Sequence, residues 1–327
     1  MTAATTATPP WRRLPWMRSR AEAATPGASA SRGSIAAPTG TAVPPLSPGL
    51  QFARAVFIMI FVIAVTMLLQ LTLIGGLQQS AAQERKFDEF RRQLATGTAP
   101  IGAVDNQDRP VAVGSPIAYL EIPEIGLRQV VVAGTTSTAL FDGPGHRRDT
   151  VLPGQAGASI IMGRQAAFGG PFGDIDRLEA GDSIVVTTGQ GEFEYEVLGV
   201  RREGDPVPPP PEPGSSRLLL ATADGRPYLP EGVLRVDADL VGEATGGPPR
   251  AFSSATLPRS EQFMGSDTST LWALVLWIQL LIALTIGAVW AWHRWGRPQA
   301  WIVFLPPLLL VGLAASGQVA RLLPNLL

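Results

Sequence analysis

Two short stretches of the chain, Arg164–Gln165 and Thr222–Arg226, hold side chains that could bind a charged ligand or take part in a reaction. These residues are Arg164, Gln165, Thr222, Asp224 and Arg226, and Ala223 lies between Thr222 and Asp224. Guanidinium groups bind carboxylate or phosphate through charge-assisted, often bidentate hydrogen bonds. We therefore take these residues as candidates for a groove that binds an acidic ligand. The alternative is that Arg164 points to water and takes no part.

Other reactive groups are few. The chain has no cysteine, which excludes disulfides, cysteine-based metal sites and thiol catalysis. His146 is the one histidine between residues 115 and 243. We interpret it as a hydrogen-bonded turn residue rather than part of a site with Asp142 and Asp149, since nothing positions a nucleophile there. Four neighbouring acids are interpreted as a solvated turn, with no metal or cofactor expected: Asp174, Asp176, Glu179 and Asp182.

Short β-strands must position these side chains. Between residues 115 and 243 the chain consists of β-branched or alternating runs separated by Gly, Pro and Asp. Such runs predict an all-β barrel or sandwich with a few short helical turns. If one strand runs through Ala223, then Thr222 and Asp224 point to its opposite face. The segment GDPVPPPPEPGSS, from Gly204 to Ser216, predicts an exposed polyproline loop.

Three apolar runs are long enough to cross a membrane as helices. They lie at residues 53–77, 270–293 and 300–323, and about 20 apolar residues span a bilayer. The first run is too long, and too far from residue 1, for a signal peptide, so we expect an uncleaved anchor. Pro306 and Pro307 in the third run predict a kinked helix, with a re-entrant hairpin as the alternative.

Charge is unevenly distributed, although the net charge is only -1. Residues 1–54 hold six Arg and one Glu, whereas residues 115–243 hold ten Arg and nineteen acids. Because basic segments stay on the cytoplasmic side, we expect residues 1–52 to form a disordered cytoplasmic tail and 294–299 a short cytoplasmic turn. The domain at 115–243 then lies outside the cytoplasmic membrane. Its acidity disfavours nucleic acid as a partner.

Two further segments connect these parts. Residues 78–114 show helical spacing and then lose it, which predicts a solvated juxtamembrane helix or stalk followed by a linker. Residues 244–269 are rich in Gly, Pro and Ser and predict a second linker. The 25 Arg against one Lys, with much Ala, Gly and Pro, indicate a bacterial genome rich in G and C.

The domain at 115–243 resembles the sortases, particularly their actinobacterial class E and F branches. The similar residues follow in the order and spacing typical of that family: YLEIPEIGL (Tyr119–Leu127), GTTSTALFDGPGH (Gly134–His146), LPGQAGASIIMGRQ (Leu152–Gln165), PFGDIDRLEAGDSIVV (Pro171–Val186) and RLLLATAD (Arg217–Asp224). The resemblance implies an eight-stranded β-barrel transpeptidase from a Gram-positive bacterium. In that family a Cys thiolate attacks a peptide carbonyl within a C-terminal sorting motif. A His serves in proton transfer, and an Arg stabilises the developing oxyanion.

This chain departs from the family at both reactive positions. The resemblance places Arg164 where the family has its His, and Ala223 where it has its Cys. Arg164 stays charged at physiological pH and cannot exchange a proton, and Ala223 has no nucleophilic atom. The family's Arg corresponds to Arg226 in RPYLPEGVLRV, with Arg235 as the fallback because the spacing after Ala223 is shorter than usual.

We therefore expect a membrane-anchored pseudosortase, a non-catalytic binding or assembly module at the outer face of the cytoplasmic membrane. The expected partners are the lipid bilayer and another membrane or cell-wall protein, or a peptide. One alternative is a transpeptidase or hydrolase of altered chemistry with a Ser or Thr nucleophile, which would need an adjacent base. Another is a membrane scaffold in which the barrel is a spacer. A transporter is disfavoured because the apolar runs hold no charge pair.

Overall fold

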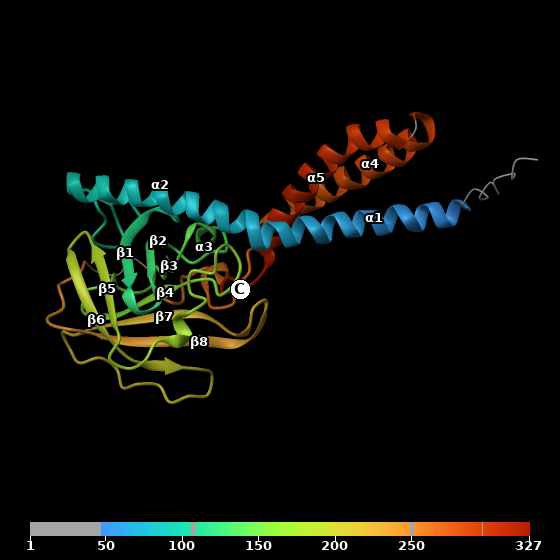
Figure 1. The fold of residues 1–327 in the computed structure, drawn as a ribbon. Coiled ribbons are helices and arrows are strands. Elements are labelled where there is room, and N and C mark those ends of the chain that lie inside the picture. Colours follow the sequence, from blue (N-terminus) through green and yellow to red (C-terminus); the bar gives the residue numbers. More distant parts are fainter. Residues whose placement is uncertain (1–46, 106–108, 249–251, 296) are drawn as a thin grey trace, which may run out of the picture. The chain divides into compact units, whose positions relative to one another are not determined.

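The computed structural model describes residues 47–105, 109–248, 252–295 and 297–327. Most of the expected cytoplasmic tail, residues 1–46, lies outside the described residues. The rest of the chain forms a β-barrel, a long helix before it and two helices after it (Figure 1). This arrangement confirms the prediction of an all-β barrel flanked by one N-terminal and two C-terminal apolar helices.

Eight strands form the closed barrel. They are β1 (Pro116–Ile122), β2 (Leu127–Ala133), β3 (Gly145–His146), β4 (Gly157–Met162), β5 (Ser183–Thr188), β6 (Gly191–Arg201), β7 (Ser216–Arg226) and β8 (Leu229–Leu240). Their order around the barrel is β1-β2-β3-β4-β7-β8-β6-β5, and β5 pairs with β1 to close it. β4 and β7 run parallel, with Met162 opposite Ala221. This register brings the ends of β4 and β7 side by side.

β7 is covered on both faces, and its residues alternate between them. Leu218 and Leu220 belong to the main core of the barrel. Ala221 and Ala223 lie on the other face, in a second buried cluster that includes Met162. A strand buried on both faces reads as a nearly continuous apolar run, which accounts for the sequence RLLLATA. The outer face of β4 and β7 is therefore covered rather than open to solvent at this place.

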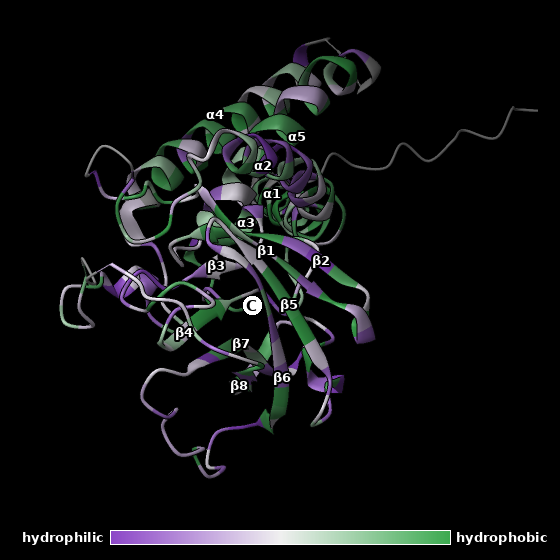
Figure 2. Cartoon of the chain, turned by 90° about the vertical axis from the view of Figure 1, so that its left-hand side faces the viewer, coloured by the Kyte–Doolittle hydropathy of each residue, from purple (hydrophilic) through white to green (hydrophobic). Residues whose placement is uncertain are grey.

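Among the described residues, three helices are long and apolar enough to cross a membrane. The first lies within α1 (Pro48–Leu69), a π-helical turn (Gln70–Ile74) and α2 (Gly75–Thr96), which follow one another directly; the others are α4 (Leu271–Trp295) and α5 (Arg297–Leu322). Figure 2 shows hydrophobic residues along α4 and α5. α5 continues through Pro306 and Pro307 as one helix, so the re-entrant hairpin considered from the sequence is wrong.

α5 packs closely against α1 through small residues. Ser316 Oγ donates a hydrogen bond to Thr66 Oγ1 at 3.1 Å. A Cβ on Gly312 would lie 3.2 Å from the Thr66 side chain, so the backbone of α5 approaches α1 there. Small residues at such positions let membrane helices associate. Near the start of α1, the Arg54 guanidinium lies 5.2 Å from the ring centroid of Trp292, which places this end beside the end of α4.

α2 lies along β1 and β2 instead of standing free in water (Figure 1). Gln83 Oε1 accepts a hydrogen bond from the Val130 N–H at 2.6 Å, and Gln83 Nε2 donates to the Asp142 carbonyl at 2.7 Å. One turn further on, the rings of Phe87 and Tyr119 are 5.1 Å apart. The prediction of a solvated helix or stalk is wrong, because glutamine side chains form a barrel-facing surface that reads as polar in the sequence.

The segment 244–269 also packs on the barrel over part of its length, which corrects its description as a linker. Glu261 is buried and forms an ion pair with Arg148. The ring centroid of Phe263 lies 5.4 Å from the Arg235 guanidinium. A composition rich in Gly, Pro and Ser concealed the few charged and aromatic side chains that hold this segment in place.

The proline-rich loop between β6 and β7 is mostly exposed and has no regular secondary structure, as the sequence predicts. The Pro209 carbonyl accepts a hydrogen bond from Arg217 at the start of β7. Arg217 also pairs with Asp239 on β8, with 2.6 Å between nitrogen and oxygen. One guanidinium thus links the loop to two strands.

Candidate functional site

The candidate site lies where β4 and β7 end. Gly163 follows β4, and its N–H donates to the Ala221 carbonyl at 3.0 Å, which extends the strand pairing by one residue. A Cβ on Gly163 would lie 2.5 Å from the ring of Phe172, so a larger residue would force the ring to move. Arg164 and Gln165 then leave the sheet close to the end of β7.

Arg164 is fully buried. Its Nη1 donates to the main-chain oxygen of Leu327 at 3.1 Å, and its Nη2 donates to the Ser137 carbonyl at 3.3 Å. The guanidinium carbon lies 4.9 Å from the ring centroid of Phe141 and 5.2 Å from that of Phe168. Aromatic faces attract a cation, and the attraction is stronger where water is excluded.

These contacts hold a charged group inside the protein. Burial lowers the pKa of Arg164 to about 9, which still leaves the guanidinium charged at neutral pH. A buried charge persists only where other groups compensate for the lost water. Two main-chain oxygens and two aromatic rings do so here, while Nε has no partner among the described residues. The alternative that Arg164 points to water is therefore wrong.

β7 runs without a break through Ala223. Ala223 has no exposed surface and adds its methyl group to the apolar cluster that contains Met162 and Val233. Its neighbours Thr222 and Asp224 point to the opposite side of the strand. Neither the hydroxyl nor the carboxylate can therefore take the place of a reactive group at Ala223.

A polar cavity of about 220 Å³ lies at this end of β7. Its lining includes Gln165, Asp176, Arg202, Thr222, Ala223 and Asp224. Thr222 Oγ1 and Gln165 Oε1 are buried and lack a hydrogen-bond partner among the described residues. Asp224 pairs with Arg202 at 3.2 Å. The structure thus brings together three of the predicted groove residues, around a space suited to water or a small polar group.

The two arginines considered for the third family position lie in different places. Arg226 is exposed at the end of β7, where it pairs with Leu229 across the hairpin. Arg235 on β8 lies opposite Ala221 and two residues from Val233, the partner of Ala223. The fallback residue, and not Arg226, therefore adjoins Ala223. Because Arg164 is enclosed and Arg226 is exposed, these two guanidinium groups do not form one surface clamp for an anion.

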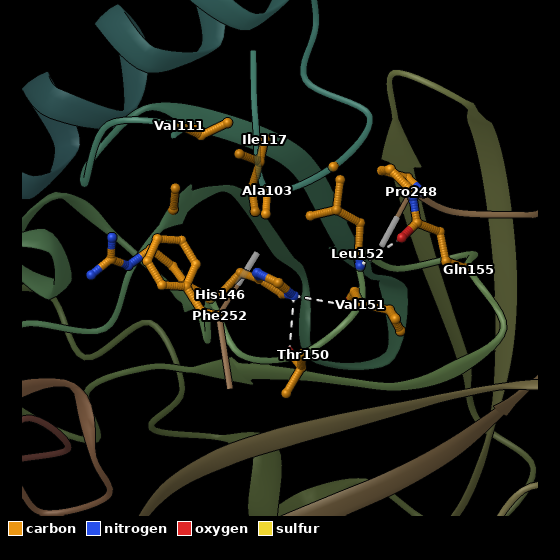
Figure 3. A pocket seen from close by; sticks show the side chains of 13 residues that line it. Ala103, Val111, Ile117, His146, Thr150, Val151, Leu152, Gln155, Pro248 and Phe252 are labelled. Atoms are coloured by element: carbon orange, nitrogen blue, oxygen red, sulfur yellow. Dashed lines mark hydrogen bonds between the residues drawn. The ribbon is translucent and has the colours of Figure 1, made fainter. Parts of the chain in front are cut away.

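His146 belongs to a different cavity, of about 30 Å³ (Figure 3). Its Nε2 donates to the Val151 carbonyl at 2.8 Å and lies 3.1 Å from Thr150 Oγ1. Burial lowers the pKa of His146 to about 4, so the ring is neutral at pH 7. Asp149 pairs with Arg147 at 2.7 Å rather than with the imidazole. The imidazole is thus satisfied by hydrogen bonds, as the sequence predicts, but His146 lies at the end of β3 and not in the turn that follows it.

Two of the acidic residues between Asp174 and Asp182 form their hydrogen bonds and ion pairs within the same turn. Asp174 pairs with Arg177 at 2.9 Å, and Asp182 Oδ2 accepts a hydrogen bond from the Glu179 N–H at 2.8 Å. In the part of the chain that the structure describes, no group of three or more His, Cys, Asp or Glu side chains is placed to hold a metal ion. Asp176 from this turn lines the polar cavity at the end of β7.

Sequence reasoning missed the residues that cover the site. Leu326 joins the apolar cluster around Ala223, and Asn325 is buried against Ser137. These residues follow a membrane helix, and their partners lie far away in the sequence; Arg164 and Leu327 are separated by 163 positions. No local pattern in the sequence signals such contacts.

Comparison with known proteins agrees with the fold. Residues 120–227 match the family model of the sortase domain. Sortase D of Bacillus subtilis (strain 168) is 28% identical over 122 residues, which cover 37% of this chain and 60% of that relative. The β-barrel is therefore similar to the sortase domain over residues 120–227, and the described part of the chain joins it to helices that could cross a membrane.

Solved structures of sortases are also similar. The Sortase D5 transpeptidase of Clostridium perfringens aligns with a TM-score of 0.42 and 23% identity, covering 50% of this chain and 99% of that one. Sortase E of Streptomyces avermitilis aligns with a TM-score of 0.34 and 24% identity, covering 46% of this chain and 99% of that one.

Proposed function

We propose that this protein is a membrane-anchored pseudosortase, a sortase domain that binds or assembles other components without transferring peptides. It works at the outer face of the cytoplasmic membrane, on cell-wall or surface proteins of a Gram-positive bacterium of the actinobacterial type. The observation that carries the proposal is the environment of Ala223. By resemblance the family's nucleophile belongs at this position, and a buried methyl group occupies it.

The surroundings of Arg164 support the same conclusion. A proton-transfer group must reach the reacting atoms and change its protonation state near the working pH. Arg164 is enclosed by Phe141 and Phe168, and its Nη atoms donate to main-chain oxygens. Its charge holds neighbouring segments together and is not free to exchange protons with a substrate.

Altered chemistry has less support. A threonine nucleophile needs a base within hydrogen-bond reach, and Thr222 Oγ1 has no such partner among the described residues. His146 is engaged with Val151 and Thr150 at another cavity. A spacer role for the barrel is also disfavoured, because α2 and the segment after α5 bond directly to it.

The test is a transpeptidation assay on the full-length protein in detergent. Fluorogenic peptides with sorting motifs and an amine acceptor are supplied, and an active sortase assayed in the same detergent is the positive control. We expect no turnover above the rate without protein. Turnover that disappears in Thr222→Ala would instead establish the altered chemistry.

A second arm tests the assembly role. Cross-linking of the full-length protein in its native membrane should give a discrete adduct with a membrane or cell-wall protein. Recovery of this chain without any adduct, across cross-linkers of different reach, would contradict assembly even if transpeptidation were absent.

A further inference from the structure

Residues 323–327, which follow α5, fill the outer face of the barrel at Ala223. Asn325 and Leu326 have no exposed surface, and Leu327 is 5% exposed. The Leu327 N–H donates to the Pro324 carbonyl at 3.2 Å, which closes a turn. In Figure 1 this end of the chain lies at the barrel. The last three of these residues are thus buried as deeply as the core, and Leu323 and Pro324 are partly exposed.

The side chain of Asn325 is held by a set of groups that matches an amide. Its Nδ2 donates to three carbonyls at 2.8–3.1 Å, and its Oδ1 accepts from Ser137 Oγ at 3.0 Å. The carbonyls belong to Thr135, Ser260 and Gln262. A carboxylate in this place would face three acceptors with none of its own protons to donate. The cradle therefore selects an asparagine-like amide.

The next residue supplies the apolar contact. Leu326 lies in the buried cluster with Met162, Ala221, Ala223 and Val233, and Phe263 packs against the same cluster. Burying a leucine side chain away from water is stabilising. This pocket exists because Ala221 and Ala223 present only methyl groups.

The main chain of the turn is bound as well. The Leu326 carbonyl accepts a hydrogen bond from the Gln165 N–H at 2.8 Å, and the main-chain oxygen of Leu327 accepts from Arg164 Nη1 at 3.1 Å. Main-chain bonds give a peptide site affinity, while side-chain pockets give it specificity. Here the two departures from the family, Arg164 and Ala223, both serve the bound turn.

We propose that the outer face of β4, β7 and β8 is a peptide-binding site for an asparagine–leucine turn, and that residues 323–327 occupy it in cis. The occupant covers Ala223, so another peptide reaches this face only after the turn leaves. The inference deepens the proposed binding role by naming the ligand class and the present occupant.

The test uses the absence of cysteine from this chain. Ala223→Cys places a single thiol beneath the turn, and Leu229→Cys places one at an exposed position, 67% exposed. Both full-length variants are labelled with a maleimide in detergent. If the turn is seated, Ala223→Cys reacts at least about tenfold more slowly than Leu229→Cys, because labelling requires local opening. Equal rates would overturn the proposal.

Two further experiments identify the segment that covers Ala223: substitutions that unseat the turn, and a peptide that replaces it. Asn325→Ala with Leu326→Ser should make the Ala223→Cys thiol reactive, whereas the Leu229→Cys thiol is unchanged. The Leu322–Leu327 peptide (LLPNLL), added in trans at increasing concentration, should restore protection, and the same peptide with alanine for Asn325 should not. Persistent protection in the released variant would assign the cover to the segment around Phe263 and overturn the proposal. Failure of the peptide to restore protection would overturn the receptor role.

Folding of each variant is checked by its near-ultraviolet circular dichroism, so that global unfolding is not mistaken for release. None of these readouts measures catalysis. Their failure would leave the proposed lack of transpeptidation standing, and turnover in the peptide assay would leave the bound turn standing.

Discussion

Arg164 shows how one residue changes the role of a position. Its guanidinium joins its own segment, which includes the ring of Phe168, to two segments that are distant in the sequence: the one with the Ser137 carbonyl and the Phe141 ring, and the one that ends with the Leu327 main-chain oxygen. Breaking such a buried arrangement by removing the charge leaves acceptors unpaired, and an unpaired buried polar group costs about 1–3 kcal/mol. The buried guanidinium thus links these segments through hydrogen bonds to main-chain oxygens.

His146 makes the stability of the barrel depend on pH. Its pKa falls from 6.5 in the unfolded chain to about 4 in the folded one because burial disfavours the cation. Between those values the unfolded state binds more protons, so stability is full above pH 6.5 and falls as the pH drops towards 4. The loss is about 1.4 kcal/mol per pH unit within that window, and about 3 kcal/mol in all. Urea unfolding of the full-length protein in detergent, followed by circular dichroism from pH 4 to 8, measures it.

The control for this prediction is His146→Gln, whose amide can still donate to the Val151 carbonyl but does not titrate. We expect this variant to have a flatter stability profile between pH 4 and 6.5. An unchanged slope in His146→Gln would assign the pH dependence to other groups.

At the scale of elements, the strands were predictable and the surfaces that cover them were not. Apolar alternation and Gly, Pro or Asp punctuation indicated the barrel, because those signals are local. α2 was taken for a solvated stalk since its barrel-facing residues include Gln79 and Gln83. The packed part of 244–269 was missed because its anchors, such as Glu261, find their partners only in three dimensions. Where a helix or segment packs through hydrogen bonds of polar side chains, its sequence shows no regular spacing of apolar residues that would predict the packing.

The contact between α1 and α5 gives a prediction at this scale. Gly312→Leu should lower the melting temperature of the detergent-solubilised protein by several degrees, since overpacking a tight contact costs about 1–3 kcal/mol. Gly317 lies on the same helix, and a Cβ there would meet no atom within 4 Å. Gly317→Leu is therefore the matched control and should change the melting temperature little. An equal fall in melting temperature for the two variants would contradict the assignment of the effect to packing against α1, since leucine is a better helix former than glycine at both positions.

For the whole molecule, contacts within the bundle support the proposed orientation in the membrane. Arg54 near the start of α1 lies over Trp292 near the end of α4. At the other end of the bundle, Leu71 and Ala320 pack with Phe168 of the sortase domain. Basic residues and the barrel thus lie at opposite ends of the helices, which agrees with a cytoplasmic start of α1 and an external barrel.

Accessibility mapping tests this orientation. Leu229→Cys on the barrel and Gln299→Cys at the start of α5 give single thiols at exposed positions in a chain without cysteine. In intact cells an impermeant maleimide should label the Leu229→Cys thiol and spare the Gln299→Cys thiol, which should react only after permeabilisation. The opposite pattern would invert the topology, and labelling of both in intact cells would show that α4 and α5 do not both cross.

Only part of the candidate site could be predicted from the sequence. Arg164 and Ala223 were recognised because the resemblance places them where the family has its His and its Cys. Gln165, Thr222 and Asp224 were added as their neighbours in the sequence. Their surroundings could not be, since the enclosure of Arg164 depends on Phe141, Phe168 and Leu327. Arg235 was ranked below Arg226 by spacing, whereas strand register sets it opposite Ala221. The register between two strands depends on how they pair. The number of residues between Ala223 and an arginine along the chain does not reveal it.

The seating of Asn325 also constrains the order in which the protein matures. Its cradle draws on Thr135 from the barrel and on Ser260 and Gln262 from the segment before α4. The turn itself arrives only after α4 and α5 have been synthesised. Until α5 has been made, Leu326 is missing from the cluster that contains Ala221 and Ala223, and only the segment around Phe263 can cover that face of β7. Partly exposed apolar surface on a growing chain invites aggregation or chaperone binding. The outer face of the barrel is therefore completed only after both C-terminal helices have been synthesised.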